Sequence, residues 1–311
     1  METNTFEPME LPDRRRARRA ASLCAFAVVA MHVVAYALYY LYSKLFPYRS
    51  GDVDLIANTV ISDLIAMPLC WLIFLRRMPR NGALCGPEAE REPLRASRFF
   101  FFLPCAYAVM YGGALTGRLI GALFGGFNDI ITVTVTMVHP LVTLLCASIL
   151  APIAEELFFR KLLIDRLSVF HPLDAILFSA LLFGLMHGNL TQFLYAFPMG
   201  ALFGIVYWRT KNIRYTILLH MVLNTLGGLI PVLIESLFPT QEFQSIALAL
   251  YGPGVIGLFV VGLVFLIRYR RRFLPIESPL PRCRKPFYLN AGWFVACAVF
   301  TAMFVFIEFF R

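Results

Sequence analysis

The chain has 311 residues, of which 59% are hydrophobic and 15% are charged, and its mean hydropathy is +0.71. Soluble globular domains contain about 25% charged residues and a smaller apolar share, so this composition excludes them and indicates an integral membrane protein. The net charge of +9 would also suit a nucleic-acid-binding protein, but the basic residues of a multi-pass membrane protein usually collect in its cytoplasmic loops.

Nine apolar segments are expected to be membrane-spanning helices, because a helix of about 20 apolar residues crosses a bilayer. They cover residues 20–46, 54–75, 99–123, 131–154, 172–188, 192–208, 214–235, 247–267 and 288–310. The first segment follows five arginines at 14–19 and is longer than the apolar part of a signal peptide, so we interpret it as a membrane helix. The predicted fold class is therefore all-α, a polytopic helical membrane protein.

The lysines and arginines indicate the orientation of these spans. If the N-terminus is cytoplasmic and the spans alternate, 24 of the 28 basic residues fall on the cytoplasmic side. Such a skew is typical of helical membrane proteins, and one miscounted span would reverse every later loop. We therefore expect a multi-pass protein of a cell membrane, such as a bacterial inner membrane, that is surrounded by lipid bilayer and has no nucleic-acid partner.

Two linkers divide the predicted chain. The loop at 76–98 is rich in Arg, Pro and Glu, and the stretch 273–281 contains three prolines. Residues of these kinds mark loops. We therefore expect three parts: residues 1–98 with two membrane helices and a basic loop, residues 99–272 with the functional core, and residues 273–311 with a proline-rich linker and the last membrane helix.

Three charged side chains, Glu155, Glu156 and Arg160, stand inside an apolar segment. Each such group costs about 2.5–3.5 kcal/mol in hydrocarbon, so it persists mainly where it is paired or functional. Glu156 and Arg160 are four residues apart and share one helix face, where they can form an ion pair. Glu155 points about 100° away from Glu156, which leaves it free to act as a general base. The same residues could instead form an ion-paired anchor at a helix end.

Two later apolar segments carry polar residues at the same four-residue spacing. His187 follows Phe183, and Asn224 follows His220. Glutamate and histidine can activate a water molecule, and histidine and asparagine can donate hydrogen bonds to an oxyanion. Each residue alone could equally be a hydrogen-bonded side chain or a polar contact between helices. The hypothesis of an active site therefore depends on the whole set.

These groups can meet only if they lie at one depth in the membrane. At about 1.5 Å per residue, Glu155 and His187 both lie about 20–25 Å from the cytoplasmic surface, provided that the helix bearing Glu155 continues to Ser168. An unbroken helix through the whole region would be too long to stand upright. We therefore expect a bend or break at Pro140 or Pro152.

Three motifs, in this order on successive apolar segments, resemble those of the CPBP family of intramembrane proteases, which includes the type II CAAX prenyl endopeptidases and the bacterial Abi proteins. They are Glu155-Glu156-x-x-x-Arg160, Phe183-x-x-x-His187 and His220-x-x-x-Asn224. The resemblance covers about residues 131–235. It implies an all-helical fold in which four core helices carry the site and hydrolyse a peptide bond near the C-terminus of a membrane-associated peptide or protein, after a prenylated cysteine in the CAAX members.

The resemblance also implies a role for each motif residue. The implied catalytic residues are Glu155, His187, His220 and Asn224, and the supporting residues are Glu156 and Arg160. Glu155 with His187 would activate the attacking water. His220 with Asn224 would stabilise the oxyanion.

The family is often described as metalloproteases, and the ligands of a metal here would be Glu155, His187 and His220. Two histidines and one carboxylate could bind zinc or hold a water molecule. The sequence contains neither a His-Glu-x-x-His motif nor paired Cys-x-x-Cys spacing. We favour catalysis by glutamate without a metal.

Two other function classes fit an intramembrane polar site. A proton-coupled transporter would use the same residue types as a relay, but such proteins often contain two similar halves, and no such duplication is visible. A non-catalytic membrane protein that gives immunity to a bacteriocin, or that acts as a scaffold, is the third class. Replacement of Glu155 separates these classes, because a scaffold would keep its function and a protease would lose it.

The expected topology can be tested with single cysteines placed in a background without the native cysteines. Gly82→Cys is expected to react with a membrane-impermeant thiol reagent from the cytoplasmic side, and Pro239→Cys from the opposite side, because five predicted spans separate the two loops. Labelling of both positions from one side would contradict the predicted orientation.

Overall fold

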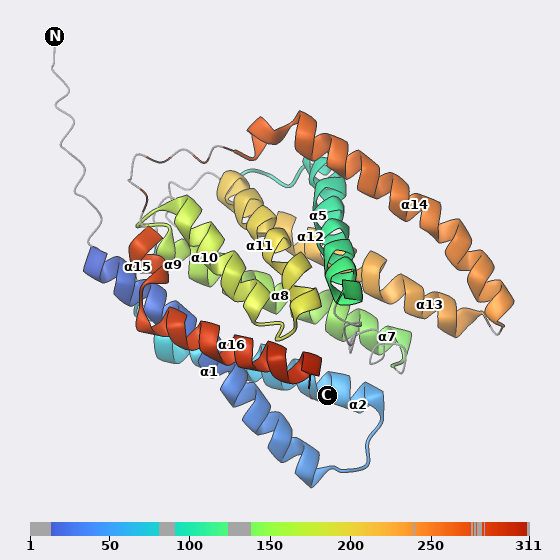
Figure 1. Ribbon diagram of the computed structural model, residues 1–311, viewed down its shortest axis with the longest axis horizontal. Helices are drawn as coiled ribbons and strands as arrows, with labels where there is room; N and C mark the ends of the chain where they lie inside the picture. The colour runs from blue at the N-terminus through green and yellow to red at the C-terminus, as the bar shows by residue number, and fades with distance from the viewer. Residues whose placement is uncertain are drawn as a thin grey trace.

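The computed structural model describes residues 14–80, 91–123, 138–238, 240–274, 276, 278, 282 and 284–309 (Figure 1). Within these residues the secondary structure is helical and contains no strand. Seven of the described helices are long and apolar enough to cross a membrane, and two shorter apolar helices, Pro172–Leu185 and Ala291–Phe306, accompany them. The all-α class is confirmed, and these helices correspond to the nine expected segments.

Four of the helices are continuous α-helices of more than 20 residues. They are α1 (Arg14–Leu45), α5 (Ala96–Leu123), α11 (Leu190–Thr210) and α14 (Gln241–Arg268). The shorter α-helices are α10 (Pro172–Leu185), α15 (Arg284–Tyr288) and α16 (Ala291–Phe309), and the 3₁₀ turn η6 covers Arg270–Arg272.

The other three long spans correspond to the second, fourth and seventh of the nine expected segments, and they alternate between α-helical and π-helical stretches. The second span contains α2 (Gly51–Thr59), η1 (Val60–Ala66), α3 (Met67–Cys70) and η2 (Trp71–Leu75). The fourth contains α7 (Pro140–Thr143), η3 (Leu144–Leu150), α8 (Ala151–Glu156), η4 (Leu157–Ile164) and α9 (Asp165–Leu167). The seventh contains α12 (Ile213–Asn224), η5 (Thr225–Leu229) and α13 (Ile230–Leu237).

The centre of the bundle is formed by α10 and α11, which pack against each other. Figure 1 shows α14 and α5 along one edge and α1 with α16 along the opposite edge. One cluster of buried apolar side chains joins these layers, from Cys24 of α1 through Phe178 of α10 to Phe102 of α5. The last helix contacts the first one directly, because the Gly292 N–H donates a hydrogen bond of 2.9 Å to Ser22 Oγ.

The helix that bears the two glutamates differs from the expected span 131–154 at both ends. It begins at Pro140 and continues without interruption to Leu167. Proline suits the first turn because its missing N–H would have no partner there. Residues 131–137 lie outside the described part of the chain. Glu155 therefore lies roughly 18 Å from the end of its helix, at the depth that the proposed site needs.

Pro152 lies inside this helix and does not break it. A proline removes one α-helical hydrogen bond and its ring crowds the preceding turn. The preceding turns, Leu144–Leu150, are π-helical, and a second π-helical stretch, Leu157–Ile164, follows. Of the two prolines expected to interrupt the region, Pro140 thus begins the helix and Pro152 is accommodated within it. The glutamates occupy a short α-helical segment between two π-helical stretches, which are frequent at functional sites.

The turn between α10 and α11 follows a helix that is shorter than the hydrocarbon core of a bilayer. α10 has 14 residues, so it is roughly 21 Å long, whereas the hydrocarbon core is about 30 Å thick. It ends at Leu185, and α11 begins at Leu190 after a turn in which Gly188 has a φ of 71°. His187 belongs to this turn.

The contact between α14 and α5 depends on one glycine. A Cβ atom at Gly262 would overlap the carbonyl oxygen of Pro104, whereas a Cβ atom at Gly257 on the same helix would meet no atom within 4 Å. Small residues allow such close approach of membrane helices. We expect Gly262→Ala to lower the Tm of the detergent-solubilised protein, by a destabilisation of roughly 1–3 kcal/mol, because the helices must separate.

Gly257→Ala is the matched control for this prediction. It adds the same methyl group to the same helix and is expected to leave the Tm unchanged or slightly higher. Equal Tm values for the two variants, measured by thermal unfolding in one detergent, would contradict the close contact.

Candidate active site

The two adjacent glutamates at the end of α8 have different surroundings. The side chain of Glu156 is 0% exposed, whereas that of Glu155 is 15% exposed. Neighbouring residues of a helix point about 100° apart, so one carboxylate faces the interior while the other reaches accessible space. Only Glu155 can therefore meet a water molecule or a peptide without a rearrangement of the core.

Arg160 is the largest buried charged side chain of the site and is only 1% exposed. Its Nε lies 3.0 Å from Glu156 Oε2, as the spacing predicted. The guanidinium also stacks over the ring of Phe183, at 4.4 Å from the centroid, and over that of Phe203, at 5.6 Å. A desolvated cation on an aromatic face is stabilised by about 2 kcal/mol. Arg160 is therefore neutralised by one carboxylate and shielded by two aromatic rings.

His220 of α12 lies between the two glutamates. Its Nδ1 is 3.0 Å from Glu156 Oε1, and its Nε2 is 3.7 Å from Glu155 Oε2. A carboxylate oxygen accepts a hydrogen bond, so Nδ1 carries the hydrogen in the shorter contact. The separation of 3.7 Å on the other side is too long for a hydrogen bond. Glu156 therefore fixes the ring of His220, and the opposite nitrogen is directed to Glu155.

Asn224 stands one turn after His220 on α12. Its Nδ2 donates a hydrogen bond of 2.9 Å to the carbonyl oxygen of Ala147. That carbonyl belongs to the π-helical stretch before the glutamates, so the bond fixes α12 against their helix. The amide nitrogen has a second hydrogen, which this bond does not use.

His187 approaches the site from the turn between α10 and α11. Its Nδ1 lies 2.8 Å from the carbonyl oxygen of Phe183, which accepts its hydrogen. Its ring contacts the ring of Phe183 edge to face at 5.0 Å, and the same Phe183 ring lies 6.0 Å from that of His220. The two histidines thus flank one phenylalanine. Because Nδ1 is the donor, Nε2 of His187 is the nitrogen that can accept a proton.

Two ionisable residues of the first two spans, Asp63 and His32, lie near the site, although neither belongs to the three motifs. Asp63 of η1 is 8% exposed and interacts electrostatically with Glu155. His32 of α1 lies with its Nε2 at 2.5 Å from the carbonyl oxygen of Met186, next to His187. The available signal was the same in both cases, an ionisable residue inside an apolar segment. Neither residue belongs to the three motifs, because its approach to the site depends on packing between spans that are distant in the sequence.

The site residues do not form a metal centre. Among the described residues, no three histidine, cysteine or carboxylate side chains are placed to hold a metal ion. His220 donates its Nδ1 hydrogen to Glu156, and His187 donates its own to a backbone carbonyl, so Nε2 is the nitrogen of each ring that a metal could bind. Within the described residues, however, Glu155, His187 and His220 are not gathered around one metal position.

The fold is that of a polytopic α-helical membrane protein, and carboxylate and histidine side chains from several of its apolar helices lie together. Residues 137–226 match the family of type II CAAX prenyl endopeptidases described as Rce1-like. Over 193 aligned residues the chain is 28% identical to "Putative membrane peptidase YdiL" of Bacillus subtilis (strain 168). The alignment covers 60% of this chain and 73% of that protein. No solved structure matches the chain. These matches confirm the resemblance to the CPBP family and support intramembrane protease activity.

The buried ion pair yields a prediction about stability. Glu156→Gln is expected to destabilise the protein by about 3–5 kcal/mol, because it leaves the Arg160 guanidinium buried without a counter-charge. The double variant Glu156→Gln with Arg160→Met removes both charges and is expected to recover much of this loss. Thermal unfolding of the three proteins in one detergent measures the difference. A double variant less stable than Glu156→Gln alone would contradict the neutralising role of Glu156.

Proposed function

We propose that this protein is an intramembrane endopeptidase that hydrolyses a peptide bond near the C-terminus of a membrane-associated protein or peptide, with Glu155 as the base that activates water. The observation that carries the proposal is the division of roles around His220. One glutamate is fully buried, neutralises Arg160 and fixes the imidazole, while its neighbour is partly accessible and faces the other imidazole nitrogen.

Glu155 is suited to take a proton from water because, in the described part of the chain, no arginine or lysine lies within ion-pair distance of its carboxylate. Arg160 contacts the other carboxylate, and Asp63 adds a further negative charge near Glu155. As the proton moves to Glu155, the water oxygen forms a bond to the carbonyl carbon of the peptide. The same proton then passes to the leaving nitrogen as the C–N bond breaks, which releases a carboxylic acid and an amine.

His187 would hold the attacking water with Glu155. Its Nδ1 hydrogen is committed to the carbonyl oxygen of Phe183, so its Nε2 can accept a hydrogen bond from water. His32 supports this arrangement, because its contact with the Met186 carbonyl fixes the backbone next to His187. We also propose that the turn between α10 and α11 lies within the membrane thickness, because α10 has only 14 residues, and that water reaches this nitrogen by a path shorter than the full bilayer.

His220 and Asn224 would stabilise the negative charge that develops on the carbonyl oxygen. When His220 carries a proton on both nitrogens, Glu156 balances the charge from the Nδ1 side, and Nε2 can donate to the oxyanion. The second amide hydrogen of Asn224 is the other donor in this proposal. Each donor aimed at an oxyanion contributes about 2.7–4 kcal/mol to transition-state stabilisation.

The proposed substrate is a membrane-associated chain, and a prenylated C-terminus is the specific form that the similarity suggests. The matching family is that of the type II CAAX prenyl endopeptidases, and the relative from Bacillus subtilis is named as a membrane peptidase. We also propose a cytoplasmic N-terminus. Under this orientation the basic ends of the helices face the compartment in which prenylated tails are made.

Peptide cleavage in isotopically labelled water tests the proposal. The purified protein is incubated in H₂¹⁸O with two C-terminal peptides that differ only in prenylation of the cysteine, and the products are identified by mass spectrometry. We expect hydrolysis with one ¹⁸O atom in the new carboxyl group, and a rate at least about 1,000-fold lower for Glu155→Gln, because glutamine cannot take the proton.

Glu235→Gln is the matched control, since Glu235 is an exposed acid at the far end of α13. It is expected to retain the wild-type rate. Hydrolysis by Glu155→Gln at the wild-type rate would remove Glu155 from the chemistry, and cleavage of neither peptide would count against a C-terminal endopeptidase of this substrate class.

A further inference from the structure

One tyrosine of the outer helix α14 reaches the span that carries His220 and Asn224. Figure 1 shows α14 along the edge of the bundle, where it packs against α5 and α13. Most of α14 is exposed, and Gly262 is its one fully buried residue. The hydroxyl group of Tyr251 nevertheless donates a hydrogen bond of 2.5 Å to the carbonyl oxygen of Leu226, which lies in η5 directly after α12. A helix outside the three motifs is thus bonded to the backbone beside a candidate oxyanion donor.

The Leu226 carbonyl needs this bond because its own helix supplies no donor. In an α-helix the donor would be the N–H four residues later, but the Ile230 N–H donates to the Thr225 carbonyl instead. In a π-helix the donor would lie five residues later, and that residue is Pro231, which has no N–H. An unpaired carbonyl is costly within a bilayer. The hydroxyl group of Tyr251 therefore completes the backbone pairing of this turn.

A tyrosine of α5 fixes the direction of the Tyr251 hydroxyl group. Tyr107 is 1% exposed, its ring stacks on that of Tyr111 at 4.4 Å, and its hydroxyl group is in hydrogen-bond contact with that of Tyr251. The single hydroxyl hydrogen of Tyr251 goes to Leu226, so Tyr107 is the donor between the two tyrosines. Tyr251 accepts one hydrogen bond and donates another, and it would lose both if its hydroxyl group turned away.

The turn after Asn224 contains two residues that weaken it. Gly227 and Gly228 lie in η5, and glycine is among the least favourable residues in the interior of a helix. A Cβ atom at Gly228 would meet no atom within 4 Å, so close packing does not hold this position. The side chain of Asn224 is bonded to the Ala147 carbonyl through one of its two amide hydrogens. The direction of the other hydrogen depends on the backbone that Tyr251 fixes.

We infer that Tyr251 is a positioning residue for Asn224. It pairs the Leu226 carbonyl, holds the turn that follows Asn224, and so directs the free amide hydrogen to the carbonyl oxygen of the peptide. The inference rests on the proposed function, in which Asn224 donates to the oxyanion. Tyr251 itself touches no reacting atom, because its hydroxyl group is bonded to the backbone.

Steady-state cleavage of the prenylated C-terminal peptide tests this inference. Tyr251→Phe keeps the ring and removes the hydroxyl group. We expect kcat to fall roughly 10-fold to 100-fold with KM unchanged, because a misplaced donor is lost only from the transition state. Tyr251→Phe with Pro231→Ala supplies a backbone N–H for the Leu226 carbonyl and is expected to regain most of kcat. A double variant as slow as Tyr251→Phe would overturn the inference, because the hydroxyl group would then act by another route.

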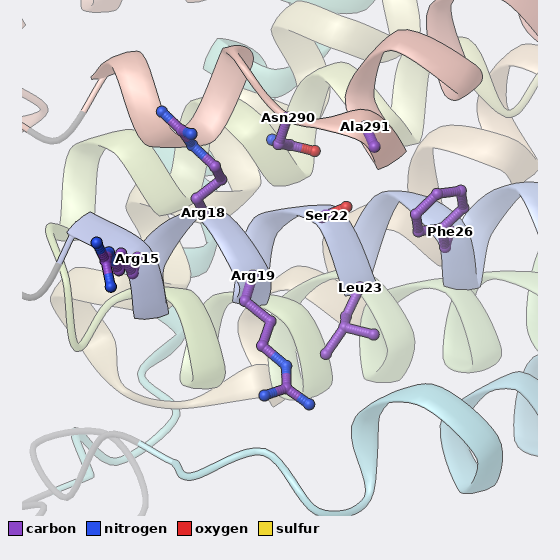
Figure 2. A pocket seen from close by; sticks show the side chains of 8 residues that line it. All are labelled: Arg15, Arg18, Arg19, Ser22, Leu23, Phe26, Asn290 and Ala291. Atoms are coloured by element: carbon purple, nitrogen blue, oxygen red, sulfur yellow. The ribbon is translucent and has the colours of Figure 1, made fainter.

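Ser22→Ala is the matched control, because it removes a bond between a side chain and the backbone of another span at the opposite edge of the bundle. Figure 2 shows Ser22 on α1 across from Ala291, beside an open cavity of about 340 Å³. Ser22 Oγ accepts from the Gly292 N–H at 2.9 Å. The variant is expected to keep the wild-type kcat. Equal losses of kcat in Ser22→Ala and Tyr251→Phe would indicate a general loosening of the bundle and overturn the inference, as would a wild-type kcat in Tyr251→Phe.

A measurement that needs no activity separates this inference from the proposed function. Solid-state NMR of the full chain labelled with ¹⁵N-asparagine reports the side-chain amide of Asn224, whose signal is assigned by its loss in Asn224→Asp. We expect the signal to shift in Tyr251→Phe, to return when Pro231→Ala is added, and to stay in place in Ser22→Ala. An unchanged signal in Tyr251→Phe would overturn the positioning role even if the wild-type protein cleaves the peptide. A shifted signal in a protein that cleaves neither peptide would support the role of Tyr251 and count against the peptidase alone.

Discussion

The burial of Arg160 inside the bilayer is the constraint on which the rest of the site depends. A guanidinium there is tolerated only with a counter-charge, and Glu156, one turn away on the same helix, supplies it at 3.0 Å. The rings of Phe183 and Phe203 cover the faces of the cation, so α10 and α11 must pack against this helix in one register. The same register brings the turn that carries His187 close to the glutamates.

Because both oxygens of Glu156 interact with buried side chains, Glu155 is the carboxylate that remains available to a substrate or a water molecule. Each of its two oxygens has one partner, Arg160 for Oε2 and His220 for Oε1. Glu155 is left beside His220 and Asp63 and is partly exposed, and among the described residues no arginine or lysine lies within ion-pair distance of its carboxylate. A structural carboxylate and a chemically available one thus arise from consecutive residues, because the helix turns them about 100° apart.

Much of this arrangement could be predicted from the sequence, for reasons that are local. Spans follow from runs of apolar residues, and the pairing of Glu156 with Arg160 follows from a four-residue spacing on one helix. The position of His220 between the glutamates could not be predicted, because it depends on how α12 is rotated against another helix. Asp63 and His32 were missed for the same reason, since their approach to the site is a property of packing between distant spans. The π-helical turns that accommodate Pro152 also have no sequence signal of their own.

The central claim is that Glu156, and not Glu155, holds His220. Solid-state NMR of the protein with ¹⁵N-labelled histidine tests it most directly, because the shift of each ring nitrogen reports whether it carries a hydrogen. We predict a hydrogen-bonded N–H at Nδ1 of His220 that is altered in Glu156→Gln and retained in Glu155→Gln. An Nδ1 without hydrogen, or one whose shift changes only in Glu155→Gln, would contradict this account.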